Sequence, residues 1–75
     1  MIESLVLIEG KNVKKENLGI SLGNAKQLVI GSVPGGSWIL HIAATSSADL
    51  GNALLQFAQV PDVTGVLTLM LRTAR

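Results

Sequence analysis

Cysteine is absent from the 75-residue sequence, which excludes disulfide bonds and every metal site built on cysteine thiolates. Histidine occurs once, as His41, and we expect it to be an ordinary strand residue satisfied by a neighbouring group or by water. The carboxylates are scattered singly along the chain: Glu3, Glu9, Glu16, Asp49 and Asp62. Because no nucleophile, acid–base pair or set of convergent ligands is assembled, the sequence predicts no enzyme, no metal site and no cofactor.

Aromatic residues and net charge are also scarce. Trp38 and Phe57 are the only aromatics, too few for a platform on which bases stack. A formal net charge of +1 gives no broad basic field, so nucleic acid is not an expected partner. The longest apolar run, residues 38–44, is interrupted by His41 and is far too short to span a bilayer. The first residues lack the basic and apolar regions of a signal peptide, and we expect a cytoplasmic location.

Apolar residues dominate what is present. Hydrophobic residues make up 48% of the chain and charged residues 15%. A chain of this length forms one domain, predicted as 1–75, or one module of a larger protein. Since the core of so small a domain cannot bury this much apolar surface, we expect an exposed apolar groove or a self-association surface, with a homodimer as one form of it.

Several short segments have the patterns of strands and predict a β-rich α+β domain. Residues 18–22 alternate Leu, Ile and Leu with Gly and Ser, which is the period of a half-buried strand. The Gly-Asn pair that follows predicts a turn over 23–26 and a hairpin with the next strand. Further strands are indicated by apolar or alternating runs at 4–8, 28–30, 38–44 and 66–71, with a break at the Pro-Gly-Gly of 34–36.

One main helix is predicted over 47–59. Ser46 or Ser47 can cap its N-terminus, and Asp49 lies in the first turn, where the helix dipole favours a negative charge. The apolar stripe consists of Leu50, Leu54 and Phe57 at helical spacing, with alanines beside it. We interpret this stripe mainly as core, and it can also form one wall of a groove.

The loop before residues 18–22 has the composition of an anion site. Lys14 and Lys15 lie beside backbone amides that lead into Gly19, and such a loop can aim several N–H groups at a carboxylate. The alternative is a solvated charged loop. If the loop does bind a carboxylate, an extended peptide could also pair with the edge of 18–22 by β-augmentation.

These segments together resemble a PDZ domain. The resemblance comes from Asn-Leu-Gly-Ile at 17–20, the strand and Pro/Gly-rich turn at 28–36, Ile-Leu-His-Ile at 39–42, the helix at 48–57 and the closing strand at 66–72. It implies a small, partly open β-barrel that captures the C-terminal tails of partner proteins. The implied peptide-binding residues are Lys14, Lys15, Leu18, Gly19, Ile20, Leu22, Leu50 and Leu54. The chain departs from the family where Asn17 replaces the first glycine, and about ten residues are missing between Gly36 and Ile39.

The alternative resemblance is to small ferredoxin-like βαββαβ proteins, namely NapD-type chaperones and the ligand-sensing domains of Lrp/AsnC regulators. It comes from the first apolar strand, the Pro-Gly-Gly before a strand, and Val-Pro-Asp-Val at 60–63 after the helix. This alternative implies a small chaperone or a ligand-sensing dimer. It requires a helix across 18–23, which two glycines and a β-branched residue disfavour.

Overall fold

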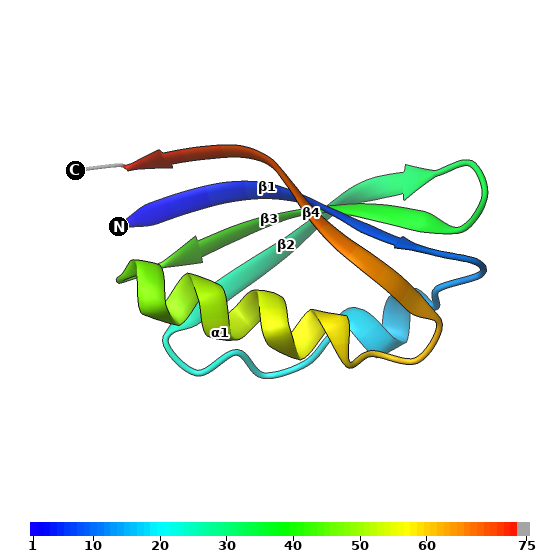
Figure 1. The fold of residues 1–75 in the computed structure, drawn as a ribbon, viewed down its shortest axis with the longest axis horizontal. Helices are drawn as coiled ribbons and strands as arrows, with labels where there is room; N and C mark the ends of the chain where they lie inside the picture. Colours follow the sequence, from blue (N-terminus) through cyan, green and yellow to red (C-terminus); the bar gives the residue numbers. More distant parts are fainter. Residues whose placement is uncertain (74–75) are drawn as a thin grey trace.

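Four strands and one α-helix account for most of the computed structural model, which describes residues 1–73 (Figure 1). The predicted domain, 1–75, extends two residues beyond this range. The elements are β1 Ile2–Gly10, the short 3-10 helix η1 Lys15–Leu18, β2 Ala25–Val33, β3 Ser37–Ala44, α1 Ser47–Ala58 and β4 Val63–Thr73. The predicted strands at 4–8, 28–30, 38–44 and 66–71 are all confirmed; three of them extend beyond both predicted ends, and β3 begins one residue earlier than predicted.

The strands form one open sheet in the order β2-β3-β1-β4, and every neighbouring pair is antiparallel. β1 and β3 are central, so β2 and β4 are the two edge strands. The register shifts once along β2, around Ile30, and twice along β4, around Leu69 and around Thr64. The class predicted from the sequence, a β-rich α+β domain with one main helix, is confirmed for the described residues.

Helix α1 confirms the helix predicted over 47–59, together with the N-terminal cap and the apolar stripe on which that prediction was based. The Ser46 side chain accepts a hydrogen bond from the Asp49 N–H at 3.1 Å, which satisfies one of the orphan donors of the first turn. Leu50, Ala53 and Phe57 face the sheet and are buried. They contribute to a core cluster with Val60, which follows α1, and with residues of the strands and of the 11–24 connection: Val6, Ile8, Val13, Leu18, Leu22, Ala25, Leu40, Ile42 and Ala44.

Residues 18–22 form neither the predicted strand nor the helix that the alternative requires. Leu18 ends η1, and residues 19–22 continue without pairing in the sheet. The period-two alternation is nevertheless expressed, because Leu18 and Leu22 are buried while Gly19 and Ser21 are exposed. The segment therefore uses its apolar side chains to cover the sheet instead of extending it. The predicted hairpin between 18–22 and 28–30 is wrong for the same reason.

The whole connection between β1 and β2 lies on the same side of the sheet as α1 (Figure 1). Two polar side chains of the sheet bind its backbone. Trp38 donates from Nε1 to the carbonyl oxygen of Val13 at 2.6 Å, and Gln27 donates from Nε2 to the carbonyl oxygen of Leu18. The predicted turn at 23–26 is likewise only half right, since Ala25 and Lys26 already belong to β2.

The predicted break at 34–36 is confirmed as the turn between β2 and β3. Gly35 and Gly36 have φ values of 104° and 99°, a region that L side chains rarely adopt. At Gly36 a Cβ atom would also lie 2.1 Å from the backbone nitrogen of Asn12. Glycine at this position lets the hairpin turn approach the start of the 11–24 connection.

Candidate functional site

The eight residues predicted to bind a peptide do not come together at one site. Leu18, Leu22 and Leu50 are buried in the core and are not available to a ligand. The exposed members, Lys14, Lys15 and Gly19, lie around η1, whereas Ile20 and Leu54 are half-buried in two different surface hollows. The strand edge that the peptide was predicted to extend is absent at 18–22. One amide of the preceding loop is also occupied, because the Asn17 N–H donates to the Lys14 carbonyl oxygen at 3.0 Å.

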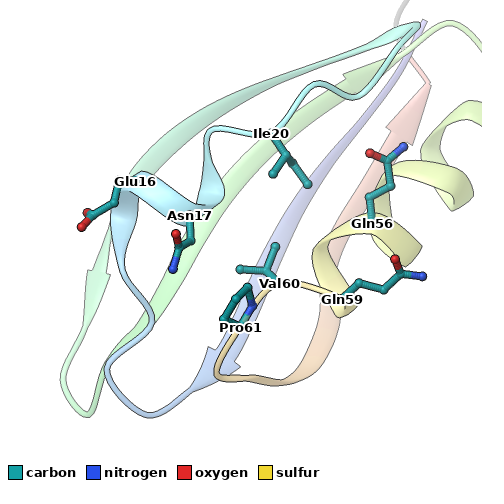
Figure 2. A pocket seen from close by; sticks show the side chains of 7 residues that line it. All are labelled: Glu16, Asn17, Ile20, Gln56, Gln59, Val60 and Pro61. Atoms are coloured by element: carbon teal, nitrogen blue, oxygen red, sulfur yellow. The ribbon is translucent and has the colours of Figure 1, made fainter.

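One hollow does include part of the predicted loop (Figure 2). It has a volume of about 430 Å³ and lies between residues 16–20 and the end of α1. Ile20 projects into it from one side, and Val60 and Pro61 form its opposite, apolar side (Figure 2). The remaining lining residues are Glu16, Asn17, Gln56 and Gln59. Glu16 is the one charged residue of this lining, and its charge is negative, so the hollow does not suit a carboxylate.

A more apolar hollow lies on the other side of α1 and is here called the α1–β4 groove. Its volume is about 650 Å³. Six of its lining residues lie on α1 and one on β4: Ala48, Gly51, Asn52, Leu54, Leu55, Ala58 and Val66. None of them is charged. Leu55 is 64% exposed although it is a large aliphatic side chain.

The sequence contained a signal for this groove that the prediction missed. Ala48, Gly51, Leu55 and Ala58 recur at spacings of three and four residues, so they form a second stripe on α1 beside the stripe that contacts the core. Three of these four residues are small, and a stripe of small residues with one leucine makes a hollow rather than a ridge. The prediction assigned Leu54 to a peptide groove, and Leu54 does line this one.

Strand β4 provides a long edge next to this groove. Among the described residues β4 pairs with β1 alone, so its other edge has no sheet partner. Natural edge strands are commonly protected by charges, proline or short length. β4 has eleven residues, contains no proline and carries one charge, at Arg72. Leu69 and Leu71, with exposed fractions of 50% and 60%, add apolar surface to the strand.

The face of the sheet opposite α1 is a further apolar surface, here called the open face. Along one row of neighbouring strands lie Leu28, His41, Leu5 and Met70. The next row brings together Gly31, Ile39, Leu7 and Leu67, and Ile30 is the extra residue of β2 at the register shift beside this row. Figure 1 shows no helix or strand of residues 1–73 over this face. Its outer members are solvent-exposed, with Leu28 at 63% and Met70 at 48%.

A polar cluster lies at one end of the open face and connects three strands. Arg72 donates from Nε to Glu3 Oε2 at 2.7 Å, and His41 Nε2 lies 3.5 Å from Glu3 Oε1. The hydrogen bond from Arg72 is the main cause that lowers the pKa of Glu3, and the charges of Arg72 and His41 act in the same direction. His41 is thus a strand residue with a neighbouring partner, as expected from the sequence.

The pKa of a second carboxylate, that of Asp49, is also shifted by hydrogen bonds to its neighbours. Hydrogen bonds from the hydroxyls of Thr45, at 2.7 Å, and Ser46, at 3.0 Å, lower the pKa of Asp49. This carboxylate lies at the N-terminus of α1, and neither it nor Glu3 lines the hollow of Figure 2 or the α1–β4 groove. The geometry therefore explains both pKa shifts through strand and helix contacts rather than through a reaction centre.

Within residues 1–73, no three His, Asp or Glu side chains lie close enough together to hold a metal ion. Over the same range, no helix combines the length and the hydropathy needed to cross a membrane. No protein-family model matches the chain, and neither the curated proteins nor the solved structures include a significant match.

Proposed function

We propose that the chain is a non-catalytic interaction module that binds an extended segment of a partner protein along the free edge of β4. The observation that carries this proposal is the position of an apolar groove directly beside an unpaired strand edge. A strand added to a sheet edge gains main-chain hydrogen bonds, while alternate side chains enter neighbouring pockets and determine selectivity. This is the β-augmentation expected from the sequence, at β4 instead of 18–22.

The chemistry of the groove defines the segment that suits it. The lining combines Leu54, Leu55 and Val66 with small residues of α1 and contains no charge. It therefore favours aliphatic side chains at alternate positions of the ligand, about 6.6 Å apart along a strand. Because no cation lines the groove, a free C-terminal carboxylate contributes little to affinity. The proposed ligand is thus an apolar extended segment in any part of a partner chain.

We further propose that the fold is a reduced ferredoxin-like arrangement and not a PDZ-like barrel. The strand order β2-β3-β1-β4 with antiparallel neighbours, and α1 between β3 and β4, supports this proposal. In place of the first helix of a βαββαβ chain stand η1 and the extended residues that follow it. The same strand order favours a second candidate function, a small chaperone or ligand-sensing dimer of the NapD or Lrp/AsnC type.

Two exposed leucines with nearly equal exposure provide a matched test. Peptides of twelve residues selected from a displayed random library would be measured by calorimetry against the unmodified chain, Leu55→Lys and Leu28→Lys. Leu55 lines the groove and is 64% exposed, whereas Leu28 lies on the open face and is 63% exposed. Losing the burial of one leucine costs roughly 1.5–3 kcal/mol, so Leu55→Lys should weaken binding at least about tenfold. Leu28→Lys should leave the affinity unchanged.

Peptide chemistry tests the proposed binding mode separately. An amidated copy of a selected peptide should bind within about twofold of the free acid, since one charged hydrogen bond is worth about 1.5–3 kcal/mol and none is expected here. Amide resonances of β4 should shift on titration. Failure to select any peptide, or binding that depends on a free C-terminus and shifts the amides of 14–20, would contradict the proposal.

A further inference from the structure

We propose that the open face is the interface of a homodimer in which a second copy of the chain packs its own open face against it. This surface is separate from the α1–β4 groove, because the two lie on opposite sides of the sheet. It includes half-buried residues of the central strands, Leu5, Leu7 and Ile39, and exposed residues of the edge strands, Leu28 and Met70. The inference therefore does not depend on the proposed peptide site.

The arrangement of side chains on the open face is that of one inner surface of a β-sandwich. Two successive rows across the four strands carry apolar side chains except at His41 and at Gly31, which has no side chain. Charged residues lie outside these rows. Lys26, Ala43, Glu3 and Arg72 form the row at one end, and Glu9 lies at the other end. Two stacked sheets bury such inner faces about 10 Å apart, with polar residues around the margin.

The size of the face suits a dimer of moderate affinity. Four strands about 4.8 Å apart and about seven residues of 3.3 Å each cover roughly 19 by 23 Å on one copy. Two such faces cover roughly 870 Å² together, which is in the range of weak, transient interfaces. We therefore expect an association that is visible at micromolar to high-micromolar concentrations of the chain.

A second copy fits this face better than the peptide proposed for the groove. An extended peptide is one strand wide and covers about 5 Å of a surface some 19 Å across. A second sheet covers the full width, and this chain supplies one of matching size and apolar character. Charge does not oppose the pairing, since the net charge is +1 and the Glu3 and Arg72 side chains of the polar row neutralise each other.

Sedimentation velocity over a series of concentrations up to about 1 mM tests the dimer. The unmodified chain should convert from monomer to dimer, and Leu28→Lys should weaken the association at least tenfold, because each dimer would bury two lysines at the interface. Leu55→Lys is the matched control and should leave the association unchanged. Met70→Lys, at a second exposed position of the same face, checks the result if Leu28→Lys perturbs folding.

A second measurement needs no variant. In a mixture of isotope-labelled and unlabelled chains, filtered nuclear Overhauser spectra should show intermolecular contacts of the Leu5, Leu7 or Ile39 methyl groups. A chain that stays monomeric at 1 mM would overturn the inference. So would a dimer that Leu55→Lys abolishes and Leu28→Lys does not, which would place the interface at the groove. Binding of selected peptides to the open face of a monomer would also overturn it.

Discussion

Replacing Leu18 with alanine should remove a large part of the stability of this domain. Leu18 is fully buried, yet it lies in a connection with no sheet pairing and only one turn of 3-10 helix. If this connection forms part of the core, the substitution leaves a cavity between it and the sheet. Leucine-to-alanine substitutions at buried sites cost about 2–5 kcal/mol, from lost burial and from the cavity itself. The full burial of Leu18 places the expected loss in the upper half of that range.

This loss is large relative to the total free energy of unfolding of the domain. Stabilities of about 0.05–0.15 kcal/mol per residue give a chain of this length roughly 4–11 kcal/mol. Leu18→Ala should therefore remove between a third and all of the free energy of unfolding. Ser21→Ala is the matched control in the same connection, because Ser21 is exposed, and it should change the stability by less than about 0.5 kcal/mol.

Urea unfolding followed by tryptophan fluorescence is the suitable assay. Trp38 is the only tryptophan, and its indole N–H donates to the Val13 carbonyl oxygen, so its emission reports directly on the docking of this connection. Circular dichroism at 222 nm follows α1 in the same samples. A loss below about 1 kcal/mol for Leu18→Ala, with the fluorescence transition preceding the helical one, would refute the assignment of the connection to the core.

Gly36→Ala should destabilise the domain by more than about 1 kcal/mol, because the alanine would combine a positive φ with a backbone clash. Gly51→Ala should stabilise the domain by about 0.5–1 kcal/mol, since a Cβ atom meets nothing at this helical position. The melting temperatures of the two variants should therefore shift in opposite directions. Ser46→Ala should cost about 1 kcal/mol through loss of the N-cap, and a cost near zero in urea unfolding would contradict the capping role. Folding lowers the pKa of both Glu3 and Asp49, so their contributions to stability are present above the ordinary pKa values of 4.5 and 3.8 and are lost as the pH falls through the lowered pKa values. The melting temperature should therefore decrease once the pH is below about 4.5, and an Asp49→Asn variant should show a smaller decrease.

The predicted site shows what local chemistry leaves undecided. Lysines beside a glycine-containing turn are compatible with a carboxylate nest, but whether the amides are free depends on how the turn closes. Here the turn closes as η1 and uses the Asn17 N–H internally. The groove on α1 was detectable in principle, because its residues lie at helical spacing. The free edge of β4, which lies beside this groove, depends on which strands pair and is not encoded in any local pattern.

Local sequence determined the elements whose signals are complete within a few residues. The cap at Ser46, the stripe through Leu50 and Phe57 and the glycines of 34–36 specify a helix and a turn through contacts among near neighbours. Period-two alternation also identified Leu18 and Leu22 as buried, whereas Ile20, at the third apolar position, is only half-buried. Only the tertiary structure decided what buries them, because an alternating extended segment can either pair in a sheet or lie across its face. Pairs distant in sequence, such as Leu5 with Met70, determine the strand order, and with it the two edges and the open face on which the proposed functions depend.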